Sequence, residues 1–243
     1  MKVKILILLP TLNEVHHISE LYKKIIKLKR NFDFLFIDDG SNDGTWEKIK
    51  EIKKNNKKSV FVIRRQNREG LGKAHKDGLF WAYKKKYTYL VTMDTDFAHD
   101  PKYIPKLLKK ISKVDLVVGS RYLRKKSTPN WSLYRILLSK GAYFTSYLLF
   151  NDAYDSTNAF RCYNLKKIKK SFISFCKSND YDFFFTSLTI LNLQKYKISQ
   201  LPMIIKGRTA GNSKMLIKHM CKSIYMMFSL FFKIKFKYKI KKI

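Results

Sequence analysis

The stretch "KILILLPTLNE", residues 4–14, opens with an unbroken run of apolar residues that stops at Pro10. A strand buried on both faces of a parallel sheet has this character, whereas a strand with one solvated face alternates polar and apolar residues. The run is too short for a spanning helix, and no signal-peptide cleavage site follows it. Four apolar residues then recur at helical spacing: Ile18, Leu21, Ile25 and Leu28. We therefore expect a buried first strand followed by an amphipathic helix.

The same alternation of strand and helix continues along the chain. Further strands are expected at "FLFI" (34–37), "SVFVI" (59–63), "YLVTM" (89–93) and "DLVVGS" (115–120), with helical spacing between them. This order predicts an α/β fold with a mostly parallel central sheet covered by helices on both sides. A length of 243 residues suits one such domain with a C-terminal appendage. Ligands of such sheets bind beyond the carboxyl ends of the strands.

The chain is strongly basic, with 51 Lys and Arg against 18 Asp and Glu and a formal net charge of +33. From Phe183 to the C-terminus there is no acidic residue. A hydrophobic content of 45% excludes general disorder, and the charge favours anionic partners such as nucleotides, nucleic acids or acidic membranes. Cys162, Cys176 and Cys221 are widely spaced, which favours neither a disulfide framework nor a zinc site and fits a reducing cytosol.

A pair of carboxylates, Asp94 and Asp96, stands two positions apart at the end of a predicted strand in "VTMDTDFAHDPKYIP". Two such groups can converge on one hard divalent cation, Mg²⁺ or Mn²⁺, and that cation can bridge the oxygens of a diphosphate. If a sugar is attached to the diphosphate, the metal stabilises the negative charge that grows on the leaving group. Such pairs also cap helices or form turns, so this motif alone is not specific.

A second acidic pair, Asp38 and Asp39, follows another predicted strand in "FIDDGSNDGTW". A carboxylate there can accept hydrogen bonds from the N–H of a uracil or guanine ring or from ribose hydroxyls. A turn with a capping Ser or Asp is the structural alternative. The turn after the first strand has no GxGxxG, which argues against a dinucleotide cofactor bound in the Rossmann manner.

Seven stretches together carry a family resemblance: "LPTLNE", "DDGSNDGT", "REGLGKAHKDGL", "MDTDFAHDPKYIP", "GSRY", "DSTNAFRCY" and "GRTAGNSK". Their order and approximate spacing resemble those of family 2 glycosyltransferases, and residues 2–214 resemble in particular the dolichyl- or polyprenyl-phosphate mannosyltransferases. The resemblance implies a GT-A domain over residues 1–214. It also implies transfer of mannose from GDP-mannose to a polyprenyl phosphate, with inversion at the anomeric carbon.

The resemblance also assigns roles to individual residues. The nucleotide sugar is assigned to Pro10, Glu14, Asp38, Asp39 and Asp94, and the metal to Asp94 and Asp96. The acceptor phosphate is assigned to basic or polar positions: Arg121, Lys140, Arg208, Ser213 and Lys214. Catalysis is expected from Asp96, Arg121 and Arg208. A phosphate monoester is largely anionic near neutral pH, so the enzyme must position two repelling anions rather than supply a base.

Several positions depart from the family pattern. Ala98 stands where Gln or Ser is frequent, and His99 is either a substitute ligand or a cap of the next helix. Lys140 replaces an Arg and lacks its bidentate fork. Leu12 replaces a Tyr, and Thr186 replaces a Glu, with Asp182 nearby as a replacement. These departures leave open another sugar, such as glucose or an amino sugar from a UDP-sugar, and also a catalytically inactive nucleotide-binding relative.

The C-terminal part contains two long amphipathic stretches, residues 131–150 and 214–232, followed by a Lys-rich alternation over residues 233–241. An ordinary core helix accounts for the first stretch as well as a surface role does. The second suits a helix in a membrane interface, so residues 215–243 are expected to bind the cytoplasmic face of a membrane peripherally. A small membrane-spanning partner subunit is compatible with this arrangement. A nucleic-acid binder would suit the charge, but no nucleic-acid module is recognisable and nucleic acid is not expected.

Overall fold

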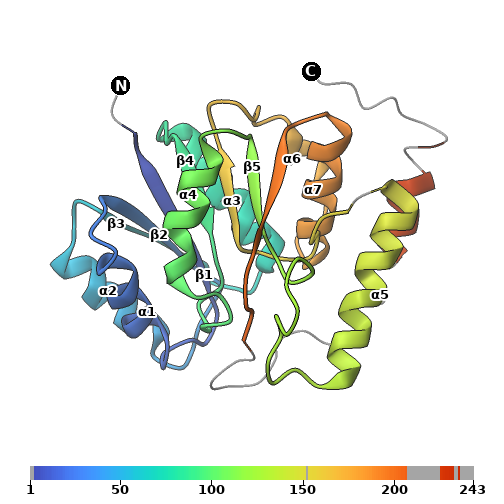
Figure 1. Cartoon of the computed structure of the whole chain (residues 1–243). Coiled ribbons are helices and arrows are strands. Elements are labelled where there is room, and N and C mark those ends of the chain that lie inside the picture. Colours follow the sequence, from blue (N-terminus) through green and yellow to red (C-terminus); the bar gives the residue numbers. More distant parts are fainter. Residues whose placement is uncertain (1–2, 152, 207–224, 233–234, 236–243) are drawn as a thin grey trace.

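The structure is a computed structural model that describes residues 3–151, 153–206, 225–232 and 235. Through its centre runs a sheet in the order β3-β2-β1-β4-β6-β5-β7 (Figure 1). The strands are β1 (Ile5–Thr11), β2 (Phe32–Asp38), β3 (Val60–Arg64), β4 (Tyr89–Thr92), β5 (Leu116–Ser120), β6 (Arg161–Asn164) and β7 (Ile198–Pro202). The predicted boundary between residues 214 and 215 lies outside the described residues.

The sheet is mostly parallel, as predicted. β1 pairs in parallel with β2 and β4, β2 with β3, and β5 with β7. The exception is β6, which runs antiparallel to both β4 and β5. Every residue of β1 after Ile5 is buried, which explains why its sequence is an unbroken apolar run.

Helices cover both faces of the sheet. One face packs against α1 (Ile18–Ile26), α2 (Thr45–Asn55) and α4 (Ile104–Ile111), and the other against α3 (Leu71–Lys84), α6 (Phe172–Phe175) and α7 (Asp182–Leu193). Alternate strand residues enter the two cores: Ile7 and Phe34 face the first group, whereas Leu6 and Leu35 face the second. A 3₁₀ turn, η1 (Pro101–Tyr103), precedes α4.

The start of α3 lies in close contact with residues 179–180. A Cβ atom at Gly72 would lie 2.4 Å from the carbonyl oxygen of Asp180, and the N–H of Lys73 donates to the carbonyl of Asn179 at 3.0 Å. Gly70, just before the helix, has a φ of 102°. The glycines of "REGLGKAHKDGL" therefore allow two segments to approach that no larger residue would permit.

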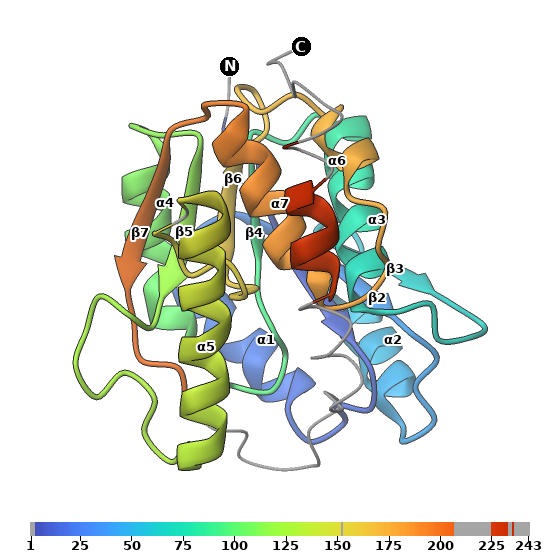
Figure 2. The same cartoon turned by 90° about the vertical axis from the view of Figure 1, so that its right-hand side faces the viewer.

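The helix α5 (Leu133–Phe150) does not pack as a core helix. Within α5 the buried residue is Ser146, whereas six large apolar side chains are exposed: Leu133, Tyr134, Leu137, Phe144, Tyr147 and Leu148. The interpretation of residues 131–150 as a core helix is therefore wrong. Figure 2 shows α5 beside α7 and the short helix at residues 225–232. The ring of Phe150 contacts those of Phe185 and Phe231, with centroids 5.3 and 6.1 Å apart.

Among the described residues, none of the helices combines the length and apolar character needed to cross a bilayer.

Candidate active site

The carboxyl ends of β1, β2 and β4 bring the predicted acidic motifs to one edge of the sheet. Thr11 at the end of β1 pairs with Asp38 at the end of β2, and the N–H of Asp39 donates to the carbonyl of Thr11 at 2.9 Å. The hydroxyl of Thr95 donates to the carbonyl of Pro10 at 3.3 Å. The residues predicted separately after three strands therefore lie together at one edge of the sheet.

Asp38 is fully buried, and its carboxylate holds the turn that follows β2. The hydroxyl of Ser41 donates to Oδ1 at 2.5 Å, the N–H of Ser41 donates to Oδ2 at 3.2 Å, and the hydroxyl of Thr11 donates to Oδ1 at 3.3 Å. The Asp38 carboxylate thus has the turn-forming role that was the structural alternative. Direct nucleotide binding by Asp38 stays a prediction, because a ligand would have to share these oxygens.

Asp39 is buried and accepts hydrogen bonds from the N–H groups of Glu69 and Gly70, both at 3.0 Å. Its Oδ1 lies 2.8 Å from the guanidinium of Arg65, which also bonds Asp77 at 2.5 Å. Burial would lower the pKa of Arg65, but the bonds to Asp39 and Asp77 raise it above its ordinary value. Arg65, which the sequence analysis did not single out, therefore remains charged beside Asp39.

A hollow of about 320 Å³ opens beside this pair. It is lined by Gly40, Ser41, Arg64, Arg65 and Gln66, from the ends of β2 and β3. Arg65 lines the hollow, and Asp39, which bonds Arg65, precedes the lining residue Gly40, so groups of opposite charge that can hydrogen-bond a polar ligand lie at this edge of the sheet.

Glu14 lies between the end of β1 and the start of α1. Its side chain is buried, and Oε2 lies 3.0 Å from Nδ1 of His17. The N–H of Glu14 donates to the hydroxyl of Thr45 at 2.7 Å, which joins this loop to the start of α2. The ring of His17 in turn meets the edge of the Phe97 ring, with centroids 5.8 Å apart. Glu14 is thus bonded directly to the start of α2, and its partner His17 contacts the turn that carries Asp94 and Asp96.

Asp94 and Asp96 follow β4 in a turn at residues 94–98, here named the DxD turn. Both residues are partly exposed, and Oδ1 of Asp96 accepts the N–H of Ala98 at 3.1 Å. His99 does not cap the next helix, because Asp100 is the cap of η1 and accepts the N–H of Lys102 at 3.0 Å. Instead, Nδ1 of His99 lies 3.0 Å from the backbone nitrogen of Asp94.

The DxD turn fits a hard divalent cation that shares its coordination with a substrate. Within the described ranges, no group of three or more His, Cys, Asp or Glu side chains is arranged to hold a metal ion. Mg²⁺ in phosphate-transferring sites is commonly held by one or two carboxylates, with substrate phosphates and water as the other ligands. Two partly exposed carboxylates at a strand end, Asp94 and Asp96, match that donor set.

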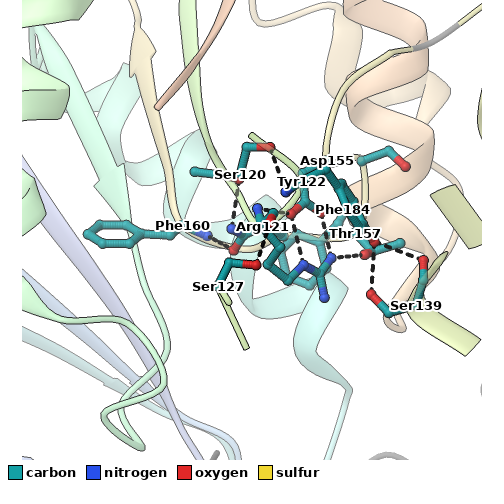
Figure 3. Close-up of polar contacts among 12 residues, drawn as sticks. Ser120, Arg121, Tyr122, Ser127, Ser139, Asp155, Thr157, Phe160 and Phe184 are labelled. Carbon is teal, nitrogen blue, oxygen red and sulfur yellow. Dashed lines mark hydrogen bonds and ion pairs between the residues drawn. The ribbon is translucent and has the colours of Figure 1, made fainter. Parts of the chain in front are cut away.

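Arg121 follows β5 and is held by a buried carboxylate, as Figure 3 shows. Its Nε and one terminal nitrogen lie 2.8 and 2.5 Å from the two oxygens of Asp155, and its backbone N–H donates to the same group at 2.9 Å. Asp155 is fully buried and the Arg121 side chain is 10% exposed. Burial would lower the pKa of Arg121, but the charge of Asp155 raises it, so the guanidinium remains protonated.

Arg135, on α5, is a second cation in this region that the sequence analysis missed. The guanidinium carbon of Arg135 lies 3.8 Å from the ring centre of Trp131, and that of Arg121 lies 5.5 Å from the same ring. Tyr122 connects α5 to this region, because its hydroxyl lies 2.8 Å from the hydroxyl and from the carbonyl oxygen of Ser139. The available signal was a Trp followed by an Arg four residues later in a helical stretch.

Lys140 is exposed on α5. The other predicted phosphate-binding residues, Arg208, Ser213 and Lys214, lie outside the described residues. Asp182, suggested as a replacement for a missing Glu, is buried at the start of α7 and accepts a hydrogen bond from Ser178 at 2.5 Å.

An α/β sheet with carboxylates at the ends of three parallel strands, and cations beside them, defines a protein built to hold a phosphorylated ligand. Comparison with known proteins specifies the class further. Residues 6–172 match the model of glycosyl transferase family 2, and the chain belongs to that family. It is therefore a glycosyltransferase.

Three curated relatives resemble most of the chain. Polyprenol monophosphomannose synthase from Mycolicibacterium smegmatis is 30% identical over 212 residues, covering 86% of this chain and 80% of the relative. Undecaprenyl-phosphate mannosyltransferase from Micrococcus luteus is 29% identical over 216 residues, covering 87% of each. Dolichol-phosphate mannosyltransferase from Pyrococcus furiosus is 30% identical over 218 residues, covering 87% of this chain and 59% of that longer relative.

Solved structures share the fold. Glucosyl-3-phosphoglycerate synthase from Mycobacterium tuberculosis, in complex with Mn²⁺, UDP and phosphoglyceric acid, superposes with a TM-score of 0.67 at 17% identity. The match covers 94% of this chain and 78% of that chain. The GT-A type of α/β fold implied by the resemblance is thereby confirmed.

Proposed function

We propose that this glycosyltransferase transfers mannose from GDP-mannose to a polyprenyl phosphate, with inversion at the anomeric carbon and with Mg²⁺ or Mn²⁺. The names of the three relatives support both the sugar and the class of acceptor. The structural observation that carries the proposal is the exposed apolar helix α5, which begins beside Arg121 and Trp131. A lipid acceptor requires an enzyme surface that meets a membrane next to the site that binds its phosphate.

The exposed face of α5 suits the interface of a membrane. Leu133, Leu137 and Leu148 are 72%, 60% and 64% exposed, far more than leucines that pack in a core. The loop before α5 adds exposed Leu123 and a run of exposed cations at residues 124–126. Apolar side chains that enter the acyl boundary, with cations at the level of anionic headgroups, characterise peripheral membrane helices. We assign this face to the cytoplasmic surface of a membrane.

On the donor side, the chain's own residues would hold the nucleotide and its diphosphate. Asp39 and Arg65 adjoin the hollow where the nucleoside would lie, and Asp94 and Asp96 would hold the metal. When bound, the metal would neutralise negative charge on the leaving diphosphate. The Mn²⁺ and UDP in the mycobacterial structure support a divalent cation at such a fold.

On the acceptor side, cations must hold a phosphate that is itself the nucleophile. Arg121 contributes a permanent charge whose direction is fixed by Asp155, and Arg135 contacts the same Trp131 ring as Arg121, with its guanidinium carbon 3.8 Å from the ring centre. Guanidinium groups bind phosphate through paired N–H donors. A phosphate oxygen that is already anionic needs no general base, so orientation and charge stabilisation account for the chemistry. Lys140, Arg208, Ser213 and Lys214 keep their assignment to this phosphate by resemblance.

The acceptor can be tested with radiolabelled GDP-mannose and three compounds: a short polyprenyl phosphate, the corresponding polyprenol, and 3-phosphoglycerate. Each is tried with and without Mg²⁺ or Mn²⁺. We expect label in the lipid extract with polyprenyl phosphate and metal. Transfer to 3-phosphoglycerate or to the polyprenol at an equal rate would contradict the proposal.

The membrane face is tested separately by flotation with vesicles that contain anionic phospholipid. Replacing Leu137 and Phe144 by Ser should reduce the vesicle-bound fraction while leaving transfer to a short acceptor in detergent near the wild-type rate. Phe80→Ser is the matched control, since Phe80 is 48% exposed on α3, away from this face. Equal binding of the α5 variant and the control would refute the role of α5.

A further inference from the structure

His99 is a buried histidine that directly follows the DxD turn. It is 3% exposed, and its ring lies against that of Phe160, with 5.1 Å between the ring centroids. Its Nδ1 atom lies 3.0 Å from the backbone nitrogen of Asp94. A backbone N–H can only donate, so Nδ1 must be the unprotonated ring nitrogen that accepts this hydrogen bond. The buried ring of His99 thus accepts a hydrogen bond from the backbone of Asp94, the first residue of the acidic pair.

Two more hydrogen bonds hold the same turn. Thr95 is buried and its hydroxyl donates to the carbonyl of Pro10, while the N–H of Ala98 donates to Oδ1 of Asp96. Within the turn, Phe97 has a φ of 60°, a left-handed conformation that is unfavourable for a bulky residue. A backbone in such a conformation persists only while its surroundings hold it there. The anchors of the turn therefore determine where the two carboxylates lie.

We propose that His99 is a positioning residue of the metal and diphosphate site. By accepting the N–H of Asp94, it sets the backbone of the DxD turn so that Asp94 and Asp96 face one cation together. This role rests on the proposed function, which assigns the metal to those two carboxylates. Loss of a group that orients metal ligands typically weakens metal binding roughly 10- to 100-fold.

Two substitutions of nearly equal shape isolate the hydrogen bond. In His99→Asn, the amide oxygen takes the place of Nδ1 and can accept the same N–H, whereas His99→Leu has the same branched shape and no acceptor. His99→Gln is a second polar variant, and its amide lies one bond further from the backbone. The control is His75→Leu: His75 is 1% exposed, and among the described residues neither ring nitrogen has a hydrogen-bond partner.

The first readout is the affinity for Mn²⁺ in the presence of GDP, measured from the electron paramagnetic resonance of free Mn²⁺. His99→Asn should remain close to wild type, and His99→Leu and His99→Gln should bind roughly tenfold more weakly or worse. The second readout is amide hydrogen exchange of residues 93–97 without metal. It should be on the order of tenfold faster in the Leu and Gln variants and unchanged in His75→Leu.

Equal Mn²⁺ affinity and equal exchange in the Asn and Leu variants would overturn the role of His99. Asp96→Asn distinguishes this failure from that of the proposed function. If Asp96→Asn binds Mn²⁺ as well as wild type while exchange still separates the Asn and Leu variants, the metal assignment is wrong. In that case the proposed metal-positioning role falls with it, although the hydrogen bond to Asp94 stands.

Discussion

We predict that the buried ion pair between Arg121 and Asp155 makes a large contribution to the free energy of unfolding, and that the effects of replacing the two residues are strongly non-additive. Asp155 is fully buried, Arg121 is 10% exposed, and three nitrogens of Arg121 lie within 2.9 Å of the carboxylate. Removing one partner of such a pair leaves an uncompensated buried charge, which destabilises by about 3–5 kcal/mol. At roughly 2 °C per kcal/mol for a chain of this size, Asp155→Leu or Arg121→Met should lower Tm by about 6–10 °C.

A double-mutant cycle measured by urea unfolding tests this value. We compare the unfolding free energy of the double variant Arg121→Met/Asp155→Leu with those of the two single variants. The decrease in the double variant should be smaller than the sum of the two single decreases by at least about 3 kcal/mol, because the double variant buries no unpaired charge. The control cycle uses Glu20 and Lys24, a pair 2.8 Å apart whose side chains are 60% and 51% exposed. Its coupling should be far smaller than that of the buried pair, because water and salt screen both charges. Additive losses at Arg121 and Asp155 would refute the reasoning.

Three other outcomes follow from the structure. Asp94→Asn and Asp96→Asn should each abolish sugar transfer with the thermal unfolding curve preserved; full activity in both would exclude the metal assignment. Burial, with the nearby charge of Arg161, lowers the pKa of His75 to about 3. The unfolded chain therefore takes up this proton first as pH falls below about 6.5, so His75 should contribute about 2 kcal/mol of destabilisation between pH 7 and pH 5. His75→Phe should lack this part of the pH dependence in urea unfolding, and an unchanged profile would argue against a neutral buried His75. Gly72→Ala should lower the free energy of unfolding by about 1–3 kcal/mol, because the new Cβ would meet the backbone of Asp180. Gly141→Ala has open space around its Cβ and should raise that free energy by about 0.5–1 kcal/mol. Equal effects of the two substitutions in thermal unfolding would contradict the close packing at the start of α3.

Sequence patterns predicted most of the sheet, because burial on both faces imposes an unbroken apolar run such as that of β1. β6 was not predicted as a strand, since its first residue is a charged Arg161. That guanidinium is fully buried and bonds the carbonyl oxygens of Ser156, Asn158 and Phe184 at 2.7–2.8 Å. Ser156 and Asn158 precede Arg161 by five and three residues, whereas Phe184 is 23 residues away. The local sequence therefore shows only part of the environment that lets this cation enter a sheet.

What surrounds the apolar face of α5 could not be predicted from the sequence either, for a different reason. An apolar helix face predicts that something covers it, and does not say whether that is protein or lipid. The packing of the described residues leaves Leu137 and Phe144 exposed and so shows that this face does not lie in the protein core.

For the site, parallel strands bring their carboxyl ends to one edge, so the convergence of Pro10, Asp39 and Asp94 followed from the predicted order of elements. The partners that fix these groups were not predictable. Arg65 is 26 residues from Asp39, and Asp155 is 34 residues from Arg121, so both pairs depend on tertiary contacts.

The most direct test of the central claim is a competition between two donors in one reaction. GDP-mannose and UDP-glucose, carrying different radiolabels at equal concentration, are offered together with a short polyprenyl phosphate and Mg²⁺ or Mn²⁺. Because both donors compete for the same enzyme, the ratio of labels in the lipid extract gives the ratio of kcat/KM values directly. The account predicts that the mannose label dominates the extract. A lipid product labelled mainly with glucose would contradict it.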